Sequence, residues 1–141
     1  MIRRIILIAL AVGIALFLAI QLVPFGHQHV NPPVTGEPVW PDPAVHALAK
    51  DACFDCHSNE TTWPWYSNIA PISWLVLNHV EEGRAYLNFS EWDRPQQGRG
   101  EISEVIGEGE MPPAYYRLLH RSANLSAAQT TQLAQGLAVL R

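Results

Sequence analysis

The longest apolar run of the chain lies at its N-terminus. Residues 5–23 carry no charge, and Gln21 is the only strongly polar residue among them. A helix of this length spans roughly 28 Å, close to the ~30 Å hydrocarbon core of a bilayer. Arg3 and Arg4 precede the run, so the positive-inside rule keeps the N-terminus in the cytoplasm. We predict a transmembrane anchor over residues 1–23, with the rest of the chain on the far side of the membrane.

A cleavable signal peptide is the alternative interpretation of this run. Its apolar region is usually shorter, about 7–15 residues, and ends at an A-x-A-like site. No such site occurs between Ala19 and His29, which favours the anchor. Both interpretations place the remaining chain outside the cytoplasm.

A proline-rich stretch follows, and we predict a linker over residues 24–41. The prolines up to the start of the next helix are Pro24, Pro32, Pro33, Pro38, Pro41 and Pro43. Such a composition favours an extended, polyproline-like backbone, which at about 3.1 Å per residue reaches up to about 60 Å. We expect a tether with His27 and His29 in solvent.

From residue 42 onward the apolar positions recur with helical spacing. Asp42 and Pro43 are typical of an N-cap and a first helical position, and Val45, Leu48, Ala49 and Ala52 follow at helical spacing. A second helix is predicted over residues 69–80, with Pro71 near its start and Gly83 just beyond its end.

Three further helical segments are predicted towards the C-terminus. Residues 95–107 form a segment interrupted by Gly98 and Gly100, and residues 113–121 form a short helical turn. Residues 126–141 give the clearest pattern, with a capping box at Ser126 and Gln129 and a stripe of Leu133, Leu137 and Leu140. Because no segment alternates like a strand, we predict an all-α domain over residues 42–141.

Charge and composition restrict the functional classes. The net charge of −4 gives no basic surface of the kind that binds nucleic acid. Lys50 is the only lysine after the anchor, and eight acidic residues between Glu81 and Glu110 face three arginines. Two interpretations remain open: the acidic residues form a solvated face, or the domain docks without a ring of lysines on a partner whose surface is neutral or basic. Asn59, Asn88 and Asn124 each begin an N-x-S/T triplet, the acceptor pattern for N-glycosylation in exported eukaryotic proteins. Nothing else in the sequence suggests that setting, so we attribute the triplets to chance.

Residues Cys53-Phe54-Asp55-Cys56-His57 form a C-x-x-C-H run, the attachment signature of c-type haem. Each thiol can add to one vinyl group, and the adjacent imidazole can then ligate the iron. We predict one covalently attached haem per chain, held by Cys53, Cys56 and His57, with His57 as proximal ligand.

Three rival interpretations share the two cysteines. A thioredoxin-like pair needs a βαβ context, but residues 42–52 show no strand pattern. A structural zinc site needs four ligands, and the other histidines are scattered along the chain. A structural disulfide across so small a loop would leave His57 unexplained.

The second axial position of the iron has several candidates. Met111 is the only methionine after the anchor, and Pro112 stiffens the backbone beside it. His79 is the alternative distal ligand, His120 is a third candidate, and an open face is the fourth possibility. The many tryptophans and tyrosines are expected to pack around a large planar cofactor or to hydrogen-bond its propionates.

The chain resembles the haem-binding domain family of small bacterial cytochrome c-like proteins. The residues that carry the resemblance are Cys53-Phe54-Asp55-Cys56-His57-Ser58-Asn59-Glu60-Thr61, Trp63-Pro64-Trp65-Tyr66-Ser67, Ile69-Ala70-Pro71-Ile72-Ser73-Trp74, Leu87-Asn88-Phe89-Ser90-Glu91-Trp92 and Gly109-Glu110-Met111-Pro112-Pro113. The resemblance implies a mostly helical fold, a covalent haem and an exported location. It implies no defined partner or substrate.

Together these features predict a monohaem c-type cytochrome anchored in the bacterial inner membrane, with its domain in the periplasm. Ligation by Met111 and His57 would fill both axial sites, which suits electron transfer between redox partner proteins and favours a carrier over an enzyme. A haem peroxidase-like enzyme is one alternative. A haem-based ligand or redox sensor is another, and both need a vacant or displaceable axial site.

Overall fold

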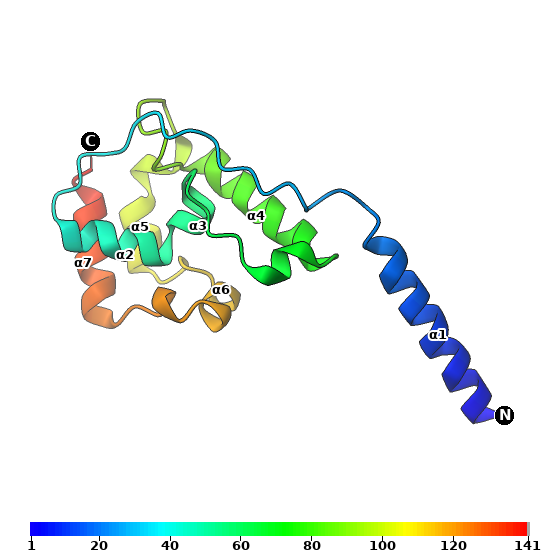
Figure 1. The fold of residues 1–141 in the computed structure, drawn as a ribbon. Helices are drawn as coiled ribbons and strands as arrows, with labels where there is room; N and C mark the ends of the chain where they lie inside the picture. The colour runs from blue at the N-terminus through cyan, green and yellow to red at the C-terminus, as the bar shows by residue number, and fades with distance from the viewer. Residues whose placement is uncertain (141) are drawn as a thin grey trace. The chain divides into compact units, whose positions relative to one another are not determined.

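The structure, a computed structural model, describes residues 1–140. Within these residues the backbone forms helices and loops and no strand, apart from an isolated parallel bridge between Gly36 and Glu91 (Figure 1). The α-helices are α1 (Ile2–Ile20), α2 (Pro43–Ala52), α3 (Phe54–His57), α4 (Ile72–Tyr86), α5 (Ile102–Gly107), α6 (Ala114–Leu119) and α7 (Ala127–Ala138). Short 3-10 turns lie at Trp65–Asn68, Gln97–Gly100 and Arg121–Ala123. The predicted all-α class is confirmed.

The chain forms two compact units, each made of segments distant in sequence. The first unit consists of Met1–Val30 and Trp63–His79. The second consists of Asn31–Thr62 and the chain from Val80 onward. Helix α4 begins in the first unit and ends in the second.

The first unit contains the apolar N-terminal helix. Helix α1 is long and apolar enough to cross a membrane, and none of its residues is buried. The predicted run at residues 5–23 and the observed helix share most of their length. After α1 the chain turns and contacts the segment from Trp63 to Trp74, which belongs to the same unit.

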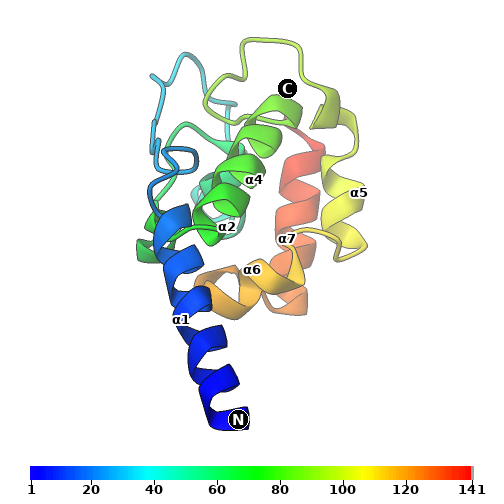
Figure 2. The ribbon, with the colours of Figure 1, turned by 90° about the vertical axis from the view of Figure 1, so that its right-hand side faces the viewer.

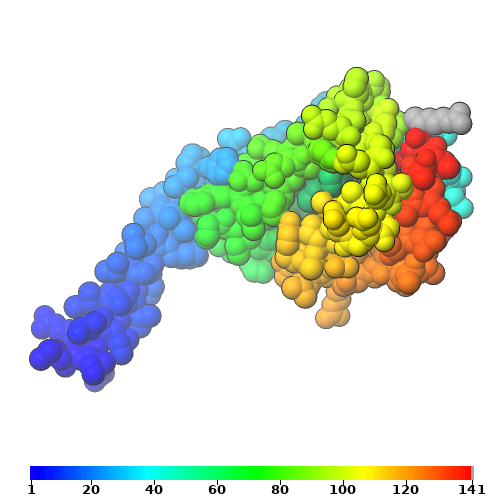
Figure 3. Space-filling model, turned by 180° about the vertical axis from the view of Figure 1, so that it is seen from behind, coloured from blue at the N-terminus to red at the C-terminus, as the bar shows by residue number. Residues whose placement is uncertain are grey.

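The core of the second unit forms where α2 meets α7. Asp42 caps α2 by accepting a hydrogen bond from the Ala44 backbone N–H at 2.6 Å. The apolar positions predicted for this helix, Val45, Leu48, Ala49 and Ala52, are all buried. Gly136 of α7 faces Val45, where an added Cβ would come within 2.5 Å of a Val45 methyl. Helix α5 lies beside α7 (Figures 2 and 3).

The capping box predicted for the last helix is confirmed. The Ser126 hydroxyl accepts from the Gln129 backbone N–H at 3.3 Å, and the Gln129 side chain accepts from the Ser126 backbone N–H at 2.9 Å. Leu133 and Leu137 are buried, as their stripe predicts. Helix α7 covers Ala127–Ala138 and so ends earlier than the predicted segment, whose last residue, Arg141, lies outside the described residues.

The predicted end of the second helix is wrong. Helix α4 continues through Gly83 to Tyr86, although glycine ordinarily terminates helices. Gly83 is needed inside the helix because a Cβ there would lie 2.4 Å from the Cys56 backbone oxygen. Glycine at position 83 thus allows close packing against the C-x-x-C-H segment and does not mark the end of a helix.

Residues 31–40 lie along the second unit. The Asn31 side chain donates to the Thr61 carbonyl at 3.0 Å, and the Thr35 and Gly36 backbone N–H groups donate to the Ser90 carbonyl at 2.9 and 3.2 Å. Trp40 packs against the core. Less chain is thus available as a free tether than its proline content predicts.

Candidate functional site

The C-x-x-C-H segment forms a single helical turn directly after α2. Cys53 ends α2, and its carbonyl accepts from the backbone N–H groups of Cys56 at 3.2 Å and His57 at 2.9 Å. Phe54, between the cysteines, is buried and stacks on Phe89 with ring centroids 5.5 Å apart. The aromatic core therefore holds the turn, while Cys53 and Cys56 remain partly exposed and are not joined by a disulfide.

The imidazole of His57 is oriented by the end of α4. Its Nδ1 lies 3.1 Å from the Gly83 carbonyl oxygen and 3.0 Å from the Leu87 carbonyl oxygen. Because carbonyl oxygens only accept, Nδ1 carries the proton and Nε2 keeps a free lone pair. Burial lowers the pKa of His57, while the two backbone hydrogen bonds act in the opposite direction. The ring is thus a neutral imidazole with a defined tautomer.

The two thiols are protonated at neutral pH. Burial, and then the neighbouring Cys56, raise the pKa of Cys53 to about 12. Burial and the Asp55 carboxylate raise the pKa of Cys56 to about 11, against the opposing effect of Arg84. Reactive dithiols need a lowered pKa. This pair is therefore poorly suited to thiol–disulfide exchange, which argues against the thioredoxin-like interpretation.

Asp55 connects the C-x-x-C-H turn to α6. Its Oδ1 accepts from the Thr62 backbone N–H at 2.9 Å, and its Oδ2 accepts from the Tyr116 hydroxyl at 2.7 Å. The same Oδ2 lies 3.6 Å from Nδ1 of His120, whose ring stacks on Tyr116 with centroids 4.0 Å apart. His120 therefore lies beside the motif, held by Asp55 and Tyr116.

Met111 lies in the loop between α5 and α6. Gly109 takes a left-handed conformation there, with φ of 76°, and the Glu110 and Met111 backbone N–H groups donate to the Val105 carbonyl at 3.1 and 3.4 Å. The Met111 side chain is 39% exposed, so it does not fill the core. Tyr116, which binds Asp55, follows five residues later. His79 lies within α4 and is the last residue of the first unit.

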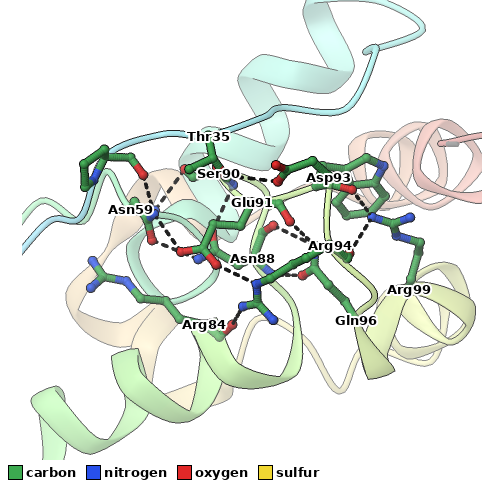
Figure 4. A network of polar contacts seen from close by, with 12 residues as sticks. Thr35, Asn59, Arg84, Asn88, Ser90, Glu91, Asp93, Arg94, Gln96 and Arg99 are labelled. Carbon is green, nitrogen blue, oxygen red and sulfur yellow. Dashed lines mark hydrogen bonds and ion pairs between the residues drawn. The ribbon is translucent and has the colours of Figure 1, made fainter.

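A polar network supports the residues that follow the motif (Figure 4). Asn59 is buried; its Nδ2 donates to the Pro33 carbonyl at 2.9 Å and to Glu91 Oε1 at 3.1 Å, and its Oδ1 accepts from Asn88 Nδ2 at 2.8 Å. Its backbone N–H donates to the Ser90 hydroxyl at 2.9 Å. Hydrogen bonds from Asn59 and Arg94 lower the pKa of Glu91. These contacts fix the C-terminal end of the motif to residues 88–91.

The roles of Asn59 and Asn88 do not follow from the sequence patterns. In the sequence both stand out only as N-x-S/T triplets, although both are buried within this network. The signal that could have identified them is the resemblance itself, since the segments that carry it include residues 53–61 and 87–92.

The expectation that His29 lies in solvent is wrong. Its ring stacks on Trp63 with centroids 4.5 Å apart, and its Nε2 lies 3.0 Å from the Ser67 carbonyl oxygen.

Within the described residues, no three His, Cys, Asp or Glu side chains are grouped in a way that could hold a metal ion. The family model described as "Haem-binding domain" matches residues 15–138, which is most of the chain. No curated protein and no solved structure matches the chain.

Proposed function

This chain belongs to the haem-binding domain family, and from that premise we propose that it is a membrane-anchored monohaem c-type cytochrome. Cys53 and Cys56 bind the haem through thioethers, His57 is the proximal ligand and Met111 the distal one. Helix α1 anchors the chain in the bacterial inner membrane, with the haem domain in the periplasm. The protein carries single electrons between redox partner proteins.

The residues present fit a covalently bound haem. Cys53 and Cys56 are unpaired, partly exposed and separated by one helical turn. In forming a thioether, each sulfur bonds to one vinyl carbon and its hydrogen goes to the other carbon. When bound, the haem supplies an iron that accepts and releases one electron.

The observation that carries the proposal is the tautomer of His57. The carbonyl groups of Gly83 and Leu87 hold the proton on Nδ1, which leaves Nε2 able to ligate a metal. A histidine that only filled space would not need two backbone acceptors at 3.0–3.1 Å. A zinc site would need further ligands grouped around it.

Met111 is supported as the distal ligand by its exposure and by its position in the chain. Its thioether is partly exposed rather than packed in the core. The loop that carries it leads directly into α6, and α6 is bound to the motif through Tyr116 and Asp55. His120 is less suited, because it is already engaged by Asp55 and Tyr116.

Two filled axial positions favour outer-sphere electron transfer over catalysis at the iron. The peroxidase-like and sensor alternatives both need an exchangeable axial site. Reduced protein that binds carbon monoxide readily would support them and count against the carrier.

The test is the intact mass and the pyridine haemochrome spectrum of the full chain, co-expressed with bacterial haem-attachment machinery. We expect a mass increase of one haem and a c-type α-band. The matched control is the Cys53→Ala/Cys56→Ala double variant, which should reach the membrane without covalent haem. A wild-type chain that weighs no more than its polypeptide would overturn the proposal.

A further inference from the structure

We infer that residues 65–75 form a second membrane contact, lying in the headgroup layer where α1 leaves the bilayer. This inference rests on the membrane anchoring proposed above. It concerns only the first unit, and it assigns a partner, the phospholipid interface, to the exposed apolar side chains of this segment.

The distribution of charge separates the two units sharply. All 13 acidic residues of the chain belong to the second unit, together with seven of the nine basic residues. In the first unit Arg3 and Arg4 are the only charged residues, and Trp63–His79 contains no Asp, Glu, Lys or Arg. A segment without charge can enter the headgroup layer without the cost of desolvating ions.

The side chains of this segment suit the membrane interface. Trp65 is 76% exposed, and Ile72 and Leu75 are 46% and 54% exposed. Ile72 and Leu75 are three residues apart in α4 and so lie on the same face of the helix, and exposed apolar patches on a protein surface usually mark an interaction site. Tryptophan and tyrosine are enriched at the level of the lipid headgroups, and Trp63, Trp65, Tyr66 and Trp74 all belong to this part of the first unit.

Gln21 fixes the segment to the end of the anchor. Its Oε1 accepts from the Ala70 backbone N–H at 2.9 Å, and its Nε2 donates to the Ala70 carbonyl at 3.0 Å. Gln21 directly follows α1, whose uncharged part after Arg3 and Arg4, residues 5–20, corresponds to about 24 Å of the ~30 Å hydrocarbon core. Gln21 and Ala70 are therefore placed near the boundary between the hydrocarbon core and the headgroup layer, which is roughly 5–7 Å thick.

Two further contacts hold the same arrangement. Gly26 approaches α4 so closely that a Cβ would lie 2.7 Å from the Ser73 carbonyl carbon. Gly26 has φ of 86°, which also favours glycine. His29 stacks on Trp63 and lies 3.0 Å from the Ser67 carbonyl through its Nε2. Three connections thus keep residues 65–75 close to the point where the anchor ends.

Photolabelling tests the inference on the full haem-loaded chain. The chain is reconstituted in phosphatidylcholine nanodiscs that contain a lipid with a diazirine near its glycerol, and the labelled residues are mapped by mass spectrometry. We expect label in α1 and in residues 65–75. Because the segment lacks charge, replacing a third of the lipid by phosphatidylglycerol should leave its labelling unchanged.

A matched pair of variants strengthens the test. Trp65→Glu/Ile72→Glu should reduce labelling of residues 65–75 several-fold while α1 remains labelled. Leu118→Glu/Leu119→Glu alters two exposed leucines of α6 in the second unit and should leave the labelling of residues 65–75 unchanged.

Three outcomes would overturn the inference. Label in α1 without label in residues 65–75 would reject the second contact and leave the anchor intact. Cross-links between two copies of the chain through residues 65–75 would assign the surface to self-association. Absence of label from α1 as well would reject the anchoring itself.

Discussion

At the scale of single residues, the tautomer of His57 is set by the two backbone carbonyls that accept from its ring. The carbonyls of Gly83 and Leu87 fix the proton on Nδ1, and burial lowers the pKa of the ring. A histidine whose folded-state pKa is lowered stabilises the fold above its ordinary pKa of 6.5, and that stability is lost as pH falls through the folded-state value. We predict that the haem-free chain loses stability as pH falls from about 7.5 to 5.

Denaturant unfolding across this pH range measures the effect, with His57→Asn as the comparison. Asparagine offers an N–H donor in place of Nδ1 but does not titrate. The pH dependence of the unfolding midpoint should be shallower in the variant. The lowered pKa of Glu91 affects stability only below its ordinary value of 4.5, outside this range. Equal slopes in both proteins would show that burial does not lower the pKa of His57 in the folded chain.

Met111 provides a second prediction at the residue scale. Ligation through its sulfur gives a near-infrared charge-transfer band in magnetic circular dichroism. Met111→Ala should abolish that band and lower the reduction potential, because the thioether stabilises ferrous iron. His79→Ala serves as the control and should leave both properties unchanged. A wild-type spectrum without the band would show that another residue, or none, occupies the position.

At the scale of elements, the contact between α3 and α4 decides the local chain path. Gly83 lies within α4, and a Cβ there would approach the Cys56 carbonyl oxygen to 2.4 Å. Because the obstructing atom is backbone, the helix must shift away from the motif. We predict that Gly83→Ala destabilises the protein by roughly 1–3 kcal/mol and reduces haem incorporation, although alanine is the better helix former.

Thermal unfolding in detergent and the yield of covalent haem check this prediction. Gly107→Ala is the matched control, since Gly107 ends α5 and a Cβ added there would meet no other part of the chain within 4 Å. That change should leave both measurements near the wild-type values or slightly raise stability. Equal behaviour of the two variants would mean that α4 does not need to approach Cys56 so closely.

Whether an element can be predicted from the sequence depends on how far apart along the chain its stabilising contacts lie. Helices α2 and α7 are predictable because their caps and apolar spacing are local, as Asp42 and Ser126 show. The end of α4 is not, because Gly83 responds to a residue 27 positions earlier in the chain. The motif indicates Cys53, Cys56 and His57 as candidates from adjacent residues alone. The partners of Asp55 and Asn59 are brought together only by the fold.

At the scale of the whole molecule, the segregation of charge accompanies the division into two units. The only charged residues of the first unit are Arg3 and Arg4, at the N-terminal end of α1. All the acidic residues belong to the second unit. The two arginines lie where the positive-inside rule places the cytoplasmic side. Orientation and haem attachment are therefore coupled, because in the proposed function the thiols are modified on the exported side.

We predict that Arg3→Glu/Arg4→Glu reduces the fraction of chains that carry covalent haem, because many would insert with the second unit in the cytoplasm. Protease accessibility in spheroplasts reports the orientation, and haem staining of the same gel reports the attachment. Arg117→Glu/Arg121→Glu makes the same change in charge within the second unit and should preserve both. If the N-terminal variant kept wild-type orientation and haem content, the two arginines would not set the topology. If orientation were lost while attachment persisted, attachment would not require export.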